Sequence, residues 1–215
     1  GVEFGSSVAN IGDLNNDGVV DLAVGESQND DGGEATGAVW ILFLNTSGGV
    51  IDEYKINSSK FGSEFSGIWF GSSVANIGDL NNDGVSDLAV GVNGNSDGGF
   101  SNGAVWILNL NTNGSIKSSY KINESRFGNG NELSGGNFGS SVANIGDLNN
   151  DGVTDIAVGE FYNDDGESAN GAVWILFLNT SGGVIDEYKI NSSRFGNGSE
   201  LSGGNFGSSV ANLGD

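Results

Sequence analysis

The chain carries a nine-residue stretch that reads Asp13-Leu14-Asn15-Asn16-Asp17-Gly18-Val19-Val20-Asp21. The same pattern returns at residues 79–87 and 147–155, and a fourth copy begins at Asp215. Each complete copy has side-chain oxygens at positions 1, 3, 5 and 9 and a glycine at position 6. Hard oxygen ligands on a tight bend that glycine permits are typical of a loop that wraps Ca²⁺. The stretch therefore predicts three calcium-binding loops presented at a fixed period.

Two other interpretations of this stretch have to be weighed. An EF-hand requires a Glu at position 12 and flanking helices, whereas position 12 is Val24, Val90 or Val158 and a strand pattern follows. An Asx-rich hairpin that turns without binding a metal is the second alternative. On the calcium interpretation, the Asp at position 9 takes the place of the missing Glu.

The composition favours short strands joined by tight turns. Among 215 residues there are 39 Gly and no Pro, and 36% of the residues are hydrophobic. Glycine spread between β-branched and aromatic runs indicates many turns. No segment reaches the roughly 18–20 apolar residues that span a membrane. Without a secretory signal or an initiator Met, the chain is expected to be part of a longer or processed product.

The charge and the missing residue types exclude several functions. The formal charge is −21, from 28 acidic and 7 basic residues, which argues against binding nucleic acid through its phosphates. The chain has no Cys, so it has neither a disulfide nor a thiolate metal site. It also has no His, which removes the commonest general base and the usual zinc ligand. The sequence therefore predicts a protein that is not an enzyme.

Internal repetition defines the organisation of the chain. Phe4-Gly5-Ser6-Ser7-Val8-Ala9-Asn10 recurs at Phe70, Phe138 and Phe206, with offsets of 66, 68 and 68 residues. The predicted units are residues 1–69, 70–137 and 138–205, with the start of a fourth at 206–215.

Each unit is predicted to form four strands, which in the first unit lie at residues 5–11, 21–25, 37–44 and 50–56. The third run is apolar throughout, as expected of a central strand covered on both faces. No stretch shows the 3.6-residue apolar period of a helix.

Four short strands in each 66–68 residues describe an all-β fold built from β-propeller blades. Known propellers use about four to eight blades, so three cannot readily close a ring. Further repeats, other copies of the chain or an open fibre would have to complete the assembly. Residues 2–13 and 205–215 are the same piece of the repeat, which favours a longer array or a self-assembling polymer.

Three segments resemble the FG-GAP repeat, the blade of integrin-α-type β-propellers and of many secreted bacterial surface proteins. They are Phe-Gly-Ser-Ser-Val, Gly-Asp-Leu-Asn-Asn-Asp-Gly-Val-x-Asp-Leu-Ala-Val-Gly and Gly-Ala-Val-Trp-Ile-Leu. The Gly-Ala-Pro segment of the family is altered to Gly25-Glu26-Ser27 and its counterparts. The resemblance implies one Ca²⁺ in each complete loop, held by carboxylate and amide side chains and a valine carbonyl. The implied ligands are Asp13, Asn15, Asp17, Val19 and Asp21; Asp79, Asn81, Asp83, Val85 and Asp87; and Asp147, Asn149, Asp151, Val153 and Asp155.

These observations predict a non-catalytic, calcium-binding extracellular or cell-surface module. It would serve adhesion or act as a structural subunit of a surface array or filament. The expected partners are further repeats or identical chains, with glycans or a surface protein as further candidates. Neither nucleic acid binding nor membrane insertion is expected. The alternative is a lectin-like propeller with glycan pockets between its blades.

Tryptophans and sequons bear on the glycan questions. Trp40, Trp106 and Trp174 lie inside apolar strands, where core packing is expected. Trp69 has no counterpart in the other units and is a candidate for contacting a ligand or a neighbouring chain.

Seven Asn-x-Ser/Thr sequons make a glycoprotein one prediction, and chance in an Asn- and Ser-rich chain is the alternative. The sequons are Asn45, Asn57, Asn113, Asn123, Asn179, Asn191 and Asn197.

Overall fold

The computed structural model describes residues 3–31, 33–62, 68–97, 101–127, 133, 135–163, 170–194, 201 and 204–214. In this part of the chain there are twelve strands and three single turns of 3₁₀ helix. The strands are β1 (Phe4–Gly12), β2 (Asp21–Glu26), β3 (Ala38–Leu44), β4 (Val50–Asn57), β5 (Phe70–Gly78), β6 (Asp87–Val92), β7 (Ala104–Leu110), β8 (Ile116–Ile122), β9 (Phe138–Gly146), β10 (Asp155–Glu160), β11 (Ala172–Leu178) and β12 (Val184–Ile190). The turns are η1 (Ser58–Lys60), η3 (Glu124–Arg126) and η4 (Ser192–Arg194).

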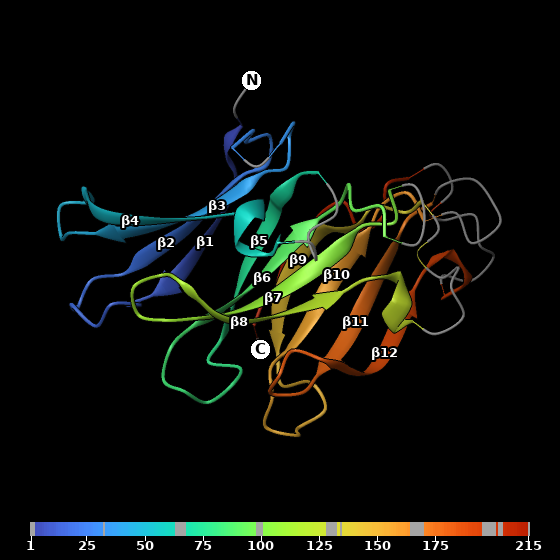
Figure 1. Ribbon diagram of the computed structural model, residues 1–215. Coiled ribbons are helices and arrows are strands. Elements are labelled where there is room, and N and C mark those ends of the chain that lie inside the picture. The colour runs from blue at the N-terminus through green and yellow to red at the C-terminus, as the bar shows by residue number, and fades with distance from the viewer. Residues whose placement is uncertain are drawn as a thin grey trace.

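The strands form three separate antiparallel sheets, in the orders β1-β2-β3-β4, β5-β6-β7-β8 and β9-β10-β11-β12. Each sheet is one sequence repeat, and sequential strands pair throughout. Figure 1 shows the sheets side by side, in blue, green and orange, without closing into a ring. The all-β architecture with four-stranded blades is therefore confirmed. We refer to the three sheets as the first, second and third blades.

Burial within a blade follows the hydrophobic pattern of each strand. β7 is buried along its whole length, whereas only the end of β8 is buried. An inner strand needs apolar side chains on both faces, which explains the uninterrupted run Ala-Val-Trp-Ile-Leu. The outermost strand has a solvent face, and its polar residues lie there.

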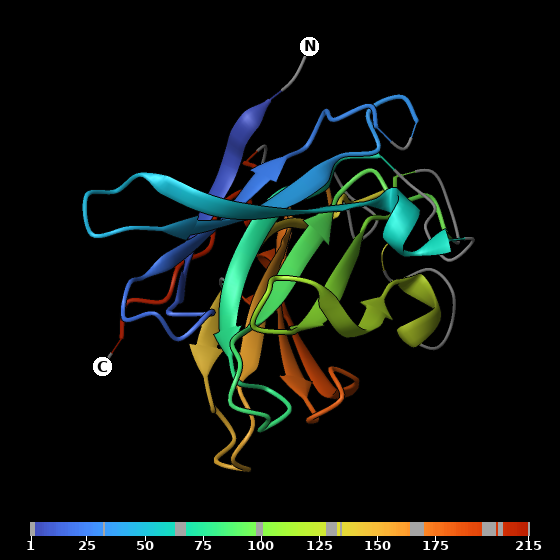
Figure 2. The ribbon, with the colours of Figure 1, turned by 60° about the vertical axis from the view of Figure 1, so that its left-hand side comes forward.

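The hydrophobic core lies between the blades rather than within one of them. β5 contacts β1, β2 and β3 of the first blade, and β9 contacts β5, β6 and β7 of the second. The first core cluster includes Ile41 and Phe43 from the first blade and Phe70 and Trp106 from the second. A second cluster joins the second and third blades in the same way. Figure 2 shows how the strands of adjacent blades cross one another.

Backbone bridges and serine hydroxyl hydrogen bonds connect each blade to the next. Gly37 forms an isolated parallel bridge with Phe70, and the Ser7 hydroxyl donates to the Gly71 carbonyl at 2.8 Å. Counterparts of both contacts recur at the other two seams. A Cβ added at Gly25 would lie 2.0 Å from the Gly71 oxygen. Close approach of the blades therefore requires glycine at this position.

The first blade differs from the others because no described part of the chain covers the outer face of β1. Phe4 and Val8 are 57% and 58% exposed, whereas Phe70 and Val74 are 0% and 8% exposed. At the other end, Phe206 forms a bridge with Gly171. The opening of the fourth repeat thus docks on the third blade, although its described residues form no strand.

Candidate metal centre

The three nine-residue stretches occupy equivalent places, each joining the first two strands of a blade. We call them the first, second and third loops, at residues 13–21, 79–87 and 147–155. In every loop the Asp at position 9 is the first residue of a strand, β2, β6 or β10. The loops protrude from the blades, and the second and third lie at the bottom of Figure 1.

The acidic side chains at positions 1 and 5 fold each loop around themselves. In the first loop, Asp13 accepts hydrogen bonds from the backbone N–H groups of Asp17, at 2.9 Å, and Gly18, at 2.8 Å. Asp17 Oδ1 accepts another from the Val19 N–H at 2.8 Å. The same bonds recur in the second and third loops. Carboxylates at these positions therefore determine the loop conformation before any ligand is considered.

Left-handed backbone conformations allow this tight winding. Gly18 has φ +87°, and the residue two places earlier, Asn16, has φ +62°. Asn tolerates this region better than most residues with a Cβ. This left-handed conformation is the structural reason for an Asn at position 4 of the loop. The counterparts in the other loops adopt nearly the same angles.

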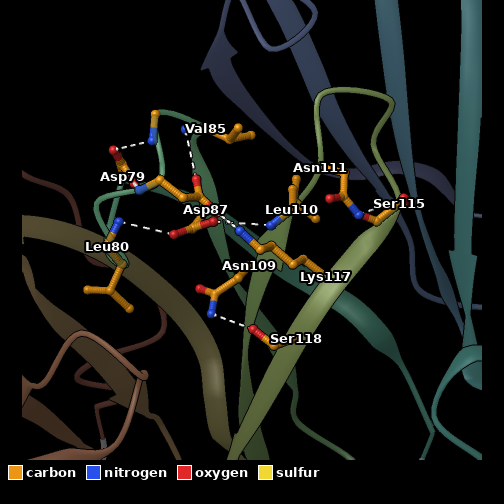
Figure 3. Close-up of polar contacts among 12 residues, drawn as sticks. Asp79, Leu80, Val85, Asp87, Asn109, Leu110, Asn111, Ser115, Lys117 and Ser118 are labelled. Carbon is orange, nitrogen blue, oxygen red and sulfur yellow. Dashed lines mark hydrogen bonds and ion pairs between the residues drawn. The ribbon is translucent and has the colours of Figure 1, made fainter.

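The Asp at position 9 has a second role that the sequence does not reveal. Asp21 is fully buried, and its Oδ2 accepts a hydrogen bond from the Leu14 N–H at 3.0 Å. Its Oδ1 accepts one from the Leu44 N–H at 3.1 Å, at the end of β3. The carboxylate thus joins the loop, β2 and β3. Asp87 and Asp155 make the equivalent bonds, and Figure 3 shows those of Asp87.

Burial of Asp87 and Asp155 disfavours the charged form of their carboxyl groups. Desolvation raises the pKa of Asp87 to about 6, although the Leu110 and Leu80 N–H groups oppose this shift. Burial also raises the pKa of Asp155. A bound cation would offset this cost, because an opposite charge favours the ionised carboxylate.

The second loop has a cationic partner. Lys117 from β8 contacts Asp83 Oδ2 with its ammonium nitrogen at 2.7 Å (Figure 3). This hydrogen bond lowers the pKa of Asp83 and raises that of Lys117. The equivalent residues in the first and third blades are Ile51 and Ile185, both more than half exposed. The sequence analysis did not identify Lys117 as a partner of the loop. The signal that could have found it is the Lys at a position where the first and third repeats have Ile.

The donor atoms fit a hard divalent cation such as Ca²⁺. Asn81 Oδ1, at position 3 of the second loop, is buried and has no hydrogen-bond partner in the described part of the chain. Lys117 is the one cation that pairs with any of the loops among the described residues. The three carboxylates of the first loop and those of the third are thus not neutralised by Lys or Arg. An orphaned amide oxygen and uncompensated carboxylates are the chemistry that Ca²⁺ satisfies.

The carboxylates do not, however, form a ready-made cluster. In the part of the chain that the structure describes, no three acidic side chains converge in a metal-binding arrangement. The reason is visible in the hydrogen bonds, since the side chains at positions 1, 5 and 9 each turn toward backbone N–H groups. In each copy the predicted ligands therefore lie in the same loop, but their oxygens do not converge. A bound metal would draw these oxygens together.

The strand tryptophans are structural. Trp106 and Trp174 are 2% and 3% exposed, which confirms the prediction of core packing. Trp40 is half-buried beside the open face of the first blade, and its indole N–H donates to Glu26 at 2.7 Å. Trp69 lies outside this arrangement, beside a pocket between the first two blades.

Together, the blades and loops define a β-propeller-type repeat protein with an Asp-rich loop in every blade. The FG-GAP repeat profile matches residues 4–42, 70–108 and 138–176. The chain therefore belongs to the FG-GAP repeat family. Each match covers the first two strands of a blade, its loop and most of the third strand.

Similar proteins include integrin α subunits. Integrin alpha-4 of Xenopus laevis is 36% identical over 165 residues, which are 76% of this chain and 15% of that protein. Integrin alpha-PS5 of Drosophila melanogaster is 38% identical over 139 residues, 64% of this chain and 12% of that protein. Integrin alpha-6 of Gallus gallus is 36% identical over 160 residues, 73% of this chain and 13% of that protein. The chain thus matches less than a sixth of the length of each of these relatives.

No helix in the described residues is both long and apolar enough to cross a membrane.

Proposed function

We propose that this chain is a non-catalytic, calcium-binding extracellular or cell-surface propeller module that serves adhesion or forms part of a surface array. The observation that carries the proposal is the threefold recurrence of one loop whose carboxylates lack cationic partners in two of its three copies. Similarity to integrin α subunits supports the cell-surface setting and the adhesive role.

Calcium would act as a structural ion. The ligands would be the side chains at positions 1, 3, 5 and 9 and the carbonyl at position 7 of each loop. The ion would neutralise part of the −21 charge, which otherwise destabilises the compact state by self-repulsion. Millimolar extracellular Ca²⁺ would fill even loops of modest affinity.

The test is thermal unfolding with excess Ca²⁺ and with EDTA. A site at a ligand concentration 100 times its Kd stabilises the fold by about 2.7 kcal/mol, and each kcal/mol raises the Tm by about 2–4 °C in a chain of this size. We expect EDTA to lower the Tm by about 5 °C or more.

A matched pair of variants separates ligand loss from charge loss. Asp13→Ala should reduce the calcium-dependent part of the shift, while Asp52→Ala, an exposed site outside the loops, should leave it intact. An identical melting curve in EDTA and Ca²⁺ would reject the calcium role.

The open face of the first blade supports assembly with another blade. Phe4 and Val8 expose the surface that Phe70 and Val74 bury against the preceding blade. We infer that the partner is a further repeat of a longer chain or an identical copy. Light scattering at increasing concentration should show self-association that Phe4→Ser weakens. A strictly monomeric protein would leave further repeats in the same chain as the partner.

Glycosylation is a separate part of the proposal. Asn45, Asn113 and Asn179 are exposed in the turns between the last two strands of each blade, where a glycan would project into solvent. Asn197 lies outside the described residues. Mass spectrometry of the natural protein would detect these glycans.

A further inference from the structure

A pocket of about 360 Å³ lies at the seam between the first and second blades. Its volume is within the range of about 300–1,000 Å³ that is usual for small-molecule sites. Glu3, Ser6 and Ser27 line it from the first blade, and Trp69, Ser72 and Asn93 from the second. The pocket is formed at strand starts and at the loops after β2 and β6, away from the Asp-rich loops.

Trp69 is held in an unusual backbone conformation at this pocket. Its φ is +68°, a left-handed value that bulky residues rarely adopt. The Trp69 N–H donates to the Ala35 carbonyl at 2.8 Å, and its carbonyl accepts from the Ser72 N–H at 3.0 Å. Both contacts fix the residue to its neighbours. Strained residues of this kind concentrate at functional sites.

Glycine makes room for the indole. A Cβ added at Gly94 would lie 2.5 Å from Ile68 Cγ1 and 2.8 Å from Trp69 Cε3, so both side chains pack against the Gly94 backbone. At the seam between the second and third blades, the equivalents of Trp69 and Gly94 are Asn137 and Tyr162. The large and the small residue thus change together from one seam to the next, and only the first seam presents a Trp.

Two polar atoms in the pocket-lining residues have no hydrogen-bond partner among the residues that the structure describes. They are Ser72 Oγ and Asn93 Oδ1, and both are buried. The equivalent of Ser72 in the third blade, Ser140, does have a partner, since its hydroxyl donates to the Gly159 carbonyl at 3.1 Å. Buried polar groups without partners are uncommon and call for a water or a ligand group.

The opposite wall of the pocket is already ordered. Ser27 Oγ donates to Glu3 Oε2 at 3.2 Å, and the Ser27 N–H donates to Ser6 Oγ at 3.3 Å. Ser6 Oγ in turn donates to the Gly71 carbonyl of the second blade at 3.3 Å. A ligand would therefore meet fixed hydroxyl and carboxylate groups rather than having to order them.

We propose that this pocket binds a neutral saccharide. An indole face packs against the C–H face of a sugar ring, while hydroxyl, amide and carboxylate groups pair with its hydroxyls. The described residues that line the pocket include no Lys or Arg, and the whole chain carries a charge of −21. Sulfated, phosphorylated and sialylated sugars are disfavoured by this field. The saccharide site does not depend on calcium binding by the loops.

The test is a titration of ¹⁵N-labelled protein in excess Ca²⁺, followed by NMR. The probes are the methyl glycosides of glucose, galactose, mannose and N-acetylglucosamine, with sialic acid and choline as charged comparisons. At least one neutral glycoside should shift the indole N–H of Trp69 and the amides of Ser72 and Asn93. Sialic acid and choline should not.

Variants locate the site. Trp69→Asn should weaken binding by about tenfold, and Asn suits this backbone because Asn137 has φ +57° at the equivalent position. Ser72→Ala removes a hydroxyl without a partner, so it should weaken binding without unfolding the blade. Ser140→Ala is the matched control at the other seam and should bind normally.

Three results would overturn the saccharide site. The first is the absence of NMR shifts with every neutral glycoside. The second is a preference for choline, which would indicate a cation site formed by Trp69 and Glu3. The third is an unchanged affinity for the glycoside in Trp69→Asn. Each can be told apart from failure of the calcium proposal, because the melting experiment with EDTA does not involve the pocket.

Discussion

The first and second blades have nearly the same sequence and the same strand order, but they differ in surroundings. β5 is covered by the first blade, and Phe70 is fully buried, whereas its counterpart Phe4 is 57% exposed. The second loop is touched by Lys117, while the first has Ile51 at that position. The difference in burial comes from the position of each blade in the stack, whereas the difference at the loops comes from the Ile51 to Lys117 replacement.

The comparison teaches that equivalent residues in a repeat protein need not have equivalent energetic roles. In a stacked array, each unit relies on its neighbours for burial, because one blade cannot bury both faces alone. A single substitution at a loop then changes the charge balance at one site while the backbone stays the same. Three predictions test these differences, in order of expected size.

The largest difference concerns the two phenylalanines. Phe70→Ala should lower the free energy of unfolding by about 3–5 kcal/mol, since it leaves a cavity in the core between blades. Phe4→Ala should cost less than about 1 kcal/mol in the monomer, because its side chain is already in contact with water. Urea denaturation of both variants at low protein concentration checks this.

Equal decreases in the free energy of unfolding for Phe4→Ala and Phe70→Ala would contradict the comparison. Such a result would mean that another blade covers β1 in solution. Repeating the Phe4→Ala measurement at several protein concentrations would show whether a second copy provides that cover.

The next effect is the pH dependence that arises from Asp87. Its pKa is about 6 in the folded protein and 3.8 ordinarily, so between these values the folded state binds more protons than the unfolded state. The contribution of Asp87 to the free energy of unfolding therefore falls as the pH rises through this window. Calcium-free protein should lose stability from pH 4 to pH 7 through this group. Denaturant titrations across this range measure the slope.

Asp87→Asn is the control for this slope. The variant should be less stable overall, since an amide cannot accept from both the Leu80 and Leu110 N–H groups. Its unfolding free energy should nevertheless change less with pH. A slope as steep as that of the original protein would assign the effect to other carboxylates.

The smallest effect is expected at Lys117. An ion pair of this exposure contributes about 0.2–1 kcal/mol, so Lys117→Ile should tighten calcium binding at the second loop by a factor of about 1.4 to 5. Ile51→Lys should weaken the first loop by a similar factor. The backbone amides of Gly18 and Gly84 report on the two loops separately in a calcium titration followed by NMR. Unaltered calcium affinity in both variants would show that having to break the Lys117–Asp83 ion pair does not weaken calcium binding.

Much of the fold could be predicted from the sequence because the information is local and repeated. The strands expected at residues 5–11, 21–25, 37–44 and 50–56 lie within one residue of β1 to β4. Alternation, apolar runs and glycine-marked turns act over a few residues, so they are readable along the chain. The Asp-rich loops follow the same logic, and their ligand atoms remain a prediction to be tested with metal.

Contacts between residues distant in sequence could be known only from the folded molecule. The repeat period and the net charge can be read directly from the residues, and the strands and the spacing of the loop oxygens follow local patterns along the chain. Only the folded blades place Asp21 against the Leu44 N–H, Lys117 against Asp83, and Trp69 beside a pocket shared with Glu3. Such contacts depend on how sheets twist and stack, which no local pattern specifies.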